Sequence, residues 1–183
     1  SGVRGLNEDL THAVCYSFAL GFLKHAKGKE NAPALAVGTD QRPSSERIQQ
    51  AVFKAADTLS LEKHNLGLVP TPALAYYCQQ NNCYGVMVTG SHIPADRNGL
   101  KFYLPSGEIL KTDEDPILEK YNAVYEALDS TPLETTSQSQ ETNAFQDVQD
   151  LYTRRYTEFF KEDALKNKKI LFWGKYKRVV GKS

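Results

Sequence analysis

The chain has 183 residues, which is enough for one α/β domain and a short piece of a second. Its 22 Lys and Arg residues balance its 22 Asp and Glu residues, so we expect neither nucleic acid nor a membrane surface as a partner. No apolar run approaches the roughly 20 residues of a membrane-spanning helix, and residues 1–5 lack the basic and apolar parts of a signal peptide. These features favour a cytoplasmic protein.

Helices and strands are predicted to alternate over residues 1–128. Apolar and small residues at spacings of three and four indicate a helix from Asn7 to about Lys27, and the apolar run 34–39 indicates a strand buried on both faces. The same patterns predict, in this order, a helix from Ser44 or Ser45, a strand at 65–69, a helix at 71–81, a strand at 84–89, a strand at 99–103 and a helix at 113–128.

This alternation predicts an α/β fold with a mixed, mostly parallel sheet sandwiched by helices. In such sheets, ligands bind beyond the carboxyl ends of the strands. The loops that follow Thr39 and Thr89 both leave such ends. We therefore look for a functional site there first.

The remaining sequence divides into two parts. Residues 129–149 are polar and rich in Ser, Thr and Gln, which is typical of a linker or a long surface loop. Within residues 150–183 we expect a connecting helix at 151–160 and a strand at 169–173, the truncated start of a second domain. The basic residues at the end of the chain could instead form a nucleic-acid tail, but no aromatic platform accompanies them.

Three cysteines, Cys15, Cys78 and Cys83, make an odd number without the spacing of a zinc site. We expect them to be reduced thiols.

The loop at 89–101 carries the residues best suited to chemistry. Ser91 is a potential nucleophile, and His92 and Lys101 could transfer protons or stabilise charge. Gly90 and Gly99 would let backbone amides approach an anion closely. A plain turn is the alternative interpretation of the same residues.

A Ser/His/Asp hydrolase built on Ser91 is less favoured. The Gly-x-Ser-x-Gly motif of the nucleophile elbow is absent, and we expect the adjacent side chains of Ser91 and His92 to point away from each other.

Two arginines in other segments could bind an anion. Arg4, between glycines, could bind phosphate oxygens with its planar fork or belong to an exposed N-terminal arm. For Arg42 we favour a surface ion pair with Asp40 or Glu46, although the strand-to-helix segment 38–45 could also bind an anion.

Four segments in order resemble the α-D-phosphohexomutases, which include phosphomannomutases and phosphoglucomutases. Residues 1–5 (SGVRG) resemble the family's S-G-[IV]-R-G, and residues 37–45 (VGTDQRPSS) resemble V-G-x-D-x-R-x-S-S. Residues 89–101 (TGSHIPADRNGLK) resemble the phosphoserine loop T-A-S-H-N-P-x-x-x-N-G-x-K, and residues 70–73 fit the family's T-P loop. The resemblance covers residues 1 to about 128.

The resemblance implies an intramolecular phosphotransferase, an isomerase that interconverts hexose 1-phosphate and hexose 6-phosphate through a bisphosphorylated sugar. It makes residues 1–128 the phosphoserine-bearing domain, with Ser91 as the phosphoserine whose phosphate helps to bind Mg²⁺. His92 and Lys101 would assist proton transfer, with Arg4 as a further catalytic residue at the same site. Ser1, Arg4 and Lys101 would bind the substrate or its phosphate. The partners implied are a hexose phosphate and the remaining domains of the same polypeptide.

The chain departs from the family pattern in two ways. Gly90 and Ile93 replace the commoner Ala and Asn, a variant that favours mannose phosphates over glucose phosphates as substrates. The family's Asp-rich Mg²⁺ loop and its sugar-recognition loops are absent from these residues, so the fragment alone should be inactive. The alternative is a non-catalytic sugar-phosphate-binding module derived from the same fold.

Overall fold

The computed structural model describes residues 2–128 and 140–169. A seven-stranded sheet forms its centre, with strand order β1-β5-β4-β2-β3-β7 and with β6 paired to β5. The strands are β1 (Val3–Leu6), β2 (Ala34–Thr39), β3 (Glu62–Leu68), β4 (Tyr84–Val88), β5 (Arg97–Leu104), β6 (Gly107–Glu108) and β7 (Thr142–Asn143). The helices are α1 (His12–Ala26), α2 (Ser45–Thr58), α3 (Thr71–Asn81), the short 3-10 helix η1 (Lys111–Asp113), α4 (Glu114–Leu128) and α5 (Phe145–Thr157).

The sheet combines a parallel part with an antiparallel edge. β4, β2, β3 and β7 run parallel to one another, whereas β5 is antiparallel to β4, β1 and β6. The predicted α/β class with a mixed sheet is confirmed. All six residues of β2 are buried, as the apolar run at 34–39 predicts for a central parallel strand.

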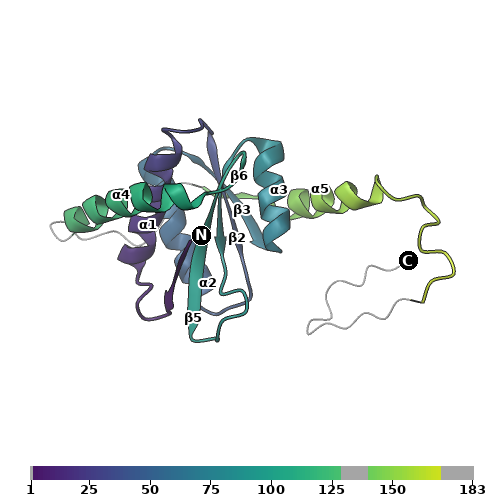
Figure 1. The fold of residues 1–183 in the computed structure, drawn as a ribbon, viewed down its shortest axis with the longest axis horizontal. Helices are drawn as coiled ribbons and strands as arrows, with labels where there is room; N and C mark the ends of the chain where they lie inside the picture. The colour runs from purple at the N-terminus through teal and green to yellow at the C-terminus, as the bar shows by residue number, and fades with distance from the viewer. Residues whose placement is uncertain (1, 129–139, 170–183) are drawn as a thin grey trace.

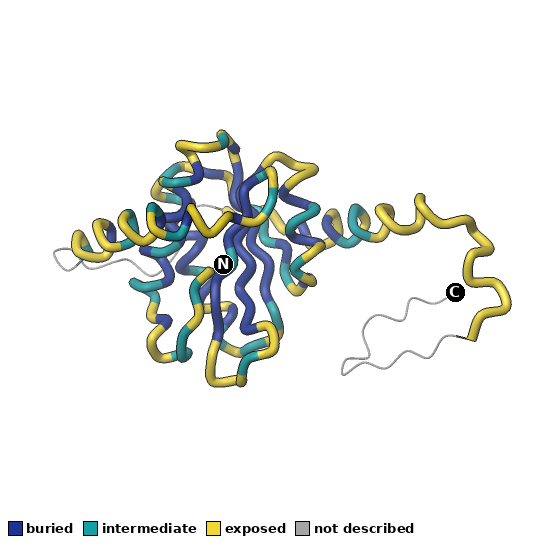
Figure 2. Tube along the Cα trace, viewed as in Figure 1, coloured by how far each residue is buried: buried dark blue, intermediate teal, exposed yellow. Residues whose placement is uncertain are grey.

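Helices cover both faces of the sheet (Figure 1). α1 packs against α2 and α4 on one face, and α3 packs against α5 on the other. The alternation of side chains along β5 separates these layers, because Phe102 joins the cluster under α1 whereas Tyr103 joins the cluster under α3. Figure 2 shows the buried sheet between the helices and the exposed far end of α5.

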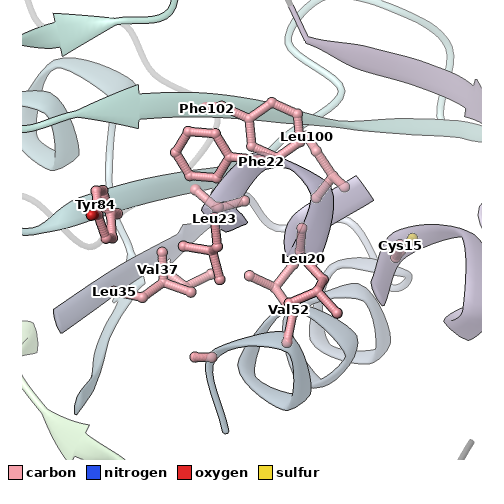
Figure 3. Close-up of a cluster of buried hydrophobic side chains, with 14 of the residues drawn as sticks. Cys15, Leu20, Phe22, Leu23, Leu35, Val37, Val52, Tyr84, Leu100 and Phe102 are labelled. Atoms are coloured by element: carbon pink, nitrogen blue, oxygen red, sulfur yellow. The ribbon is translucent and has the colours of Figure 1, made fainter. Parts of the chain in front are cut away.

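Aromatic packing closes the larger core. The rings of Phe22 from α1 and Phe102 from β5 stack with their centroids 4.7 Å apart, and Tyr84 meets Phe22 edge-on (Figure 3). Such ring pairs stabilise a core by about 0.5–1.5 kcal/mol beyond the area they bury. This core fixes α1 over the antiparallel edge of the sheet.

Several element boundaries differ from the predicted ones. The first helix begins at His12 rather than Asn7, because the hydroxyl of Thr11 accepts a hydrogen bond from the amide of Val14 and caps the helix there. β3 begins at Glu62, before the apolar run. Its Lys63 is buried because the amino group forms an ion pair with Asp57 at 2.8 Å.

The segment predicted as a linker at 129–149 contains regular structure at its end. β7 adds to the edge of β3, and α5 begins at Phe145, earlier than the predicted helix at 151–160. Ala144 and Val148 are buried in the cluster under α3, and the amide of Ala144 donates to the carbonyl of Asn65. Residues 129–139 and the predicted strand at 169–173, apart from its first residue, lie outside the described residues.

Over the ranges 2–128 and 140–169, no helix is both long and apolar enough to span a bilayer.

Candidate functional site at the ends of β2 and β4

Two loops meet where the neighbouring parallel strands β2 and β4 end. The amide of Asp40, just after β2, donates a hydrogen bond to the carbonyl of Val88, the last residue of β4, at 3.0 Å. Because the two strands are parallel neighbours, the loops that follow them leave the same edge of the sheet. The predicted location of the site is therefore where the two loops come together.

The carboxylate of Asp40 joins the two loops. Its Oδ2 accepts hydrogen bonds from the hydroxyl of Thr89 at 3.0 Å and from the amide of Gly90 at 2.9 Å. Its Oδ1 accepts from the hydroxyl of Ser45 at 2.8 Å and from the amide of Arg42 at 3.1 Å. Burial by itself raises the pKa of Asp40, but these hydrogen bonds together outweigh burial and lower it. Asp40 is thus an ionised anchor for the start of the 89–97 loop.

Ser91 lies at the exposed tip that this anchor holds. Its backbone has φ 53°, in the left-handed region, and its amide donates to the hydroxyl of Thr89 at 2.9 Å. Its Oγ lies 3.3 Å from Nδ1 of His92, within hydrogen-bond distance. The expectation that these adjacent side chains diverge is wrong, because the left-handed turn at Ser91 brings them together. An exposed hydroxyl beside an imidazole can be both phosphorylated and deprotonated.

Arg42 faces the 89–97 loop rather than open solvent. Its side chain is 14% exposed and forms the predicted ion pair with Asp40, with Nε 3.2 Å from Oδ2. It also donates to three backbone carbonyls of the loop, those of Ile93, Pro94 and Arg97. The predicted partner is therefore correct, but the ion pair is mostly buried.

Asn98 anchors the end of the same loop, a role that its sequence neighbourhood does not predict. It is fully buried, and its Nδ2 donates to the hydroxyls of Ser44 at 2.9 Å and Ser45 at 3.1 Å. Its Oδ1 accepts from the amide of Gly99 at 2.9 Å. An Asn between Arg and Gly in a polar loop reads as a turn residue, so only its burial reveals the network.

Arg4 and Lys101 lie on one face of the antiparallel edge. Arg4 pairs with Gly99 across β1 and β5, and Lys101 follows Gly99 by two residues. Residues directly opposite and residues two apart on a strand share a face, so both cations lie on the same side of the sheet. The exposed N-terminal arm considered for Arg4 is thus a paired edge strand, and Ser1 lies outside the described residues.

A cavity of about 630 Å³ opens beside Ser91. Among the described residues, the cavity is lined by Thr39, Asp40, Gln41, Arg42, Pro43, Leu68, Val69, Pro70, Ser91 and Ala95. The structure brings Ser91 and the 40–43 segment to this cavity. Arg4, His92 and Lys101 are not among the described lining residues.

Within the described residues, no group of three His, Cys, Asp or Glu side chains could hold a metal ion. The carboxylate of Asp40 already accepts hydrogen bonds at both oxygens. A phosphate on Ser91 would present hard oxygen ligands of the kind that Mg²⁺ prefers, but it would be a single ligand. These residues therefore do not form a magnesium site by themselves.

The three cysteines form no disulfide, and all three are buried.

Comparison with known proteins identifies the domain. Residues 1–127 match the family model described as phosphoglucomutase/phosphomannomutase, alpha/beta/alpha domain I. A phosphomannomutase of Salmonella muenchen is 37% identical over 171 residues, which cover 93% of this chain and 34% of that protein. A phosphomannomutase of Sinorhizobium fredii is 36% identical over 174 residues, covering 93% and 36%.

More distant relatives extend the comparison. A phosphoglucosamine mutase of Finegoldia magna is 30% identical over 139 residues, covering 75% of this chain and 30% of that protein. The fold also matches the crystal structure of a phosphoglucomutase/phosphomannomutase family protein from Burkholderia thailandensis, with a TM-score of 0.61 and 24% identity over 87% of this chain and 35% of that one.

The chain spans about a third of the length of these relatives. The family model, in contrast, accounts for most of the chain itself. The chain therefore belongs to the phosphoglucomutase/phosphomannomutase family, whose α/β/α domain I it carries in residues 1–127.

Proposed function

We propose that this chain supplies the phosphoserine domain of a mutase that interconverts hexose 1-phosphate and hexose 6-phosphate, with Ser91 as the residue that carries the phosphoryl group. The observation behind the proposal is the position of Ser91, which is exposed at the tip of an anchored loop and borders a cavity of about 630 Å³. A phosphoryl carrier needs such a place, because the phosphate has to meet a substrate while its backbone stays fixed.

The proposed reaction has two transfers. In the first, the bond between phosphorus and Ser91 Oγ breaks as a hydroxyl oxygen of the hexose monophosphate bonds to phosphorus. The proton of that hydroxyl passes to a base, and the released Oγ takes up a proton to become the serine hydroxyl. In the second, Oγ of Ser91 bonds to the other phosphorus of the hexose bisphosphate as the bond from that phosphorus to the sugar oxygen breaks. The serine proton passes to a base, and the released sugar oxygen takes up a proton. Atoms and charge balance over the cycle, and the serine phosphate is regenerated.

His92 and Lys101 are the groups we assign to proton transfer. Nδ1 of His92 lies 3.3 Å from Oγ of Ser91, which supports a role in taking the serine proton in the second transfer. Lys101 shares a sheet face with Arg4, so a phosphate above the β1–β5 edge would meet two cations. We assign substrate-phosphate binding to Arg4 and Lys101, and the resemblance adds Ser1.

Two further assignments concern the complete polypeptide. Mannose phosphates are the proposed substrates, ahead of glucose phosphates, which is supported by relatives named phosphomannomutase at 37% and 36% identity. The other ligands of the Mg²⁺ held through the Ser91 phosphate would come from domains beyond these residues. That ion would neutralise charge on the transferring phosphoryl group.

The test compares two serine variants of the complete polypeptide in a coupled mutase assay. Ser91→Ala should lower kcat at least 1,000-fold, since the phosphoryl carrier is lost, in the range of other lost nucleophiles. Ser60→Ala is the matched control, because Ser60 is also exposed and also has φ 53°. Its activity should stay within about twofold of the wild type, as at surface sites in general. Unchanged activity in Ser91→Ala would overturn the proposal.

A wild-type polypeptide that binds hexose phosphates without converting them would instead support a sugar-phosphate-binding module.

A further inference from the structure

The side chain of Arg42 uses most of its N–H donors in hydrogen bonds within the protein. Nη1 donates to the carbonyls of Pro94 at 2.5 Å and Arg97 at 2.8 Å, and Nη2 donates to the carbonyl of Ile93 at 2.6 Å. Nε donates to Asp40 at 3.2 Å. A guanidinium has five N–H donors, so these four bonds leave little for a ligand. Although Arg42 lines the cavity, its polar atoms are directed into the 89–97 loop.

The bonds of Arg42 and Asp40 fall on opposite sides of Ser91 in the chain. Asp40 holds Thr89 and Gly90, which precede Ser91, and Arg42 holds the carbonyls of residues that follow it. The ion pair between Asp40 and Arg42 connects these two sets of contacts. The loop is thus held on both sides of Ser91 by one ion pair, Asp40 and Arg42, from a different loop.

The backbone between these contacts is strained. Ser91 has φ 53°, in the left-handed region that a residue with a side chain adopts only at a steric cost. Such a conformation persists only where the surroundings over-determine it. The bonds of Arg42 and Asp40 provide this constraint, because both ends of the turn are tied to the same ion pair.

The guanidinium of Arg42 packs closely against Gly90. A Cβ atom built on Gly90 would lie 2.1 Å from both Cζ and Nε of Arg42, far inside contact distance. The guanidinium therefore occupies the space that an alanine side chain would need. With alanine at this position, the guanidinium would have to move away from the place it occupies here.

We infer that Arg42 is a positioning residue for Ser91, and that Gly90 leaves the space in which the guanidinium lies in this chain. The inference rests on the proposed role of Ser91 as phosphoryl carrier. Arg42 would act on phosphoryl transfer through the loop backbone, without touching the substrate. A displacement of a reacting group by about 1 Å can lower a rate 100-fold, so this geometry matters for turnover.

The test is a double-mutant cycle in the complete polypeptide with Arg42→Ala, Gly90→Ala and the two combined. Each single variant should lower kcat roughly 10- to 100-fold, with KM for the hexose phosphate changed by less than about threefold. The combined variant should be no worse than Arg42→Ala alone, because removing the guanidinium opens the space for the alanine side chain. Hydrogen exchange of the peptide covering 91–97 should speed up in all three.

Arg47→Ala is the matched control. Arg47 also donates to two backbone carbonyls, those of Leu10 at 2.7 Å and Asn7 at 3.0 Å. Its link to the 89–97 loop is only indirect, through the amide of Asn7, which donates to the carbonyl of Asp96. The thermal stability of Arg47→Ala should fall as it does in Arg42→Ala. Its kcat and the hydrogen exchange of the 89–97 loop should stay near those of the wild type.

The inference would be overturned if the combined variant lost kcat by the product of the two single losses. It would also be overturned if the 89–97 loop of Arg42→Ala exchanged hydrogen as slowly as in the wild type. Hydrogen exchange is measured on unphosphorylated protein, so it tests whether Arg42 holds the 89–97 loop even if Ser91 carries no phosphate. In that case the proposed function fails separately.

Discussion

The carboxylate of Asp40 accepts a hydrogen bond from the amide of Gly90 at 2.9 Å, across two loops that leave neighbouring parallel strands. A second oxygen of the same carboxylate accepts from Ser45 at the start of α2. One side chain therefore ties the loop before α2 to the loop that carries Ser91.

Asp40→Asn should destabilise the fold by roughly 1–3 kcal/mol, because the carboxamide has one acceptor oxygen where the carboxylate has two and leaves donors unpaired. Urea unfolding of the complete polypeptide measures this change. Gln41→Ala is the control, since Gln41 is an exposed neighbour in the same loop. A variant Asp40→Asn as stable as the wild type would show that the carboxylate does not hold the loops together.

The site should also be sensitive to the close approach of β1 and β5. A Cβ atom on Gly99 would lie 2.4 Å from the backbone carbonyl of Val3. Gly99→Ala should therefore push β1 from the sheet, lower the melting temperature and raise KM for the hexose phosphate, since Arg4 is on β1. Gly5→Ala is the control, because a Cβ there meets Leu10 at 3.6 Å, an ordinary contact. Equal behaviour of the two variants would contradict the proposed placement of Arg4.

Acid stability should depend on Asp113, which holds η1 against α1. Its carboxylate is 2% exposed and accepts hydrogen bonds from the amide of Leu110 and from the side chains of Lys29 and His25. Burial by itself raises the pKa of Asp113, but these bonds lower it to about 2 from its ordinary 3.8.

Because the folded pKa is depressed, this stabilisation is complete above about pH 4 and is lost as the pH falls toward about 2. Asp113→Asn should remove that part of the pH dependence and cost roughly 1–3 kcal/mol at pH 7. Urea unfolding of both proteins between pH 2 and about pH 7 measures the difference. If the free energies of unfolding of the two proteins changed with pH in the same way, Asp113 would not have the assigned role in acid stability.

The backbone strain at Ser91 can be measured directly. Ser91→Gly should be about 1 kcal/mol more stable than Ser91→Ala, since glycine adopts φ 53° without a steric cost. The same comparison at Ser60, which has the same φ, calibrates the effect outside the site. If glycine gives no gain at position 91 but does at 60, the left-handed turn at Ser91 is not populated in solution.

Much of the fold follows from local sequence patterns. The apolar run at 34–39 and the Thr-Pro start of the helix at 71–81 predict β2 and α3 with their observed bounds. The start of β3 could not be predicted, because Lys63 is buried only through its ion pair with Asp57. β1 likewise depends on a partner, β5, that is distant in sequence.

The candidate site could be assigned to a loop from the sequence, but the hydrogen bonds that hold this loop could not be predicted. The chemistry of Ser91 and His92 and their place after a buried strand predict a site in their loop, and the structure brings this loop against the one that follows β2. The acceptors of Arg42 were unpredictable because they are backbone carbonyls, which every residue has. The role of Asn98 depends on complete burial, which a polar loop does not indicate.

The most direct test of the central proposal is the phosphorylation state of Ser91 in the complete polypeptide. Mass spectrometry with fragmentation of the proteolytic peptide containing Ser91 locates any phosphate. We expect a phosphate on Ser91 that disappears when hexose monophosphate is added and returns with hexose 1,6-bisphosphate. A Ser91 that stays unmodified after treatment with the bisphosphate would contradict its role as the phosphoryl carrier.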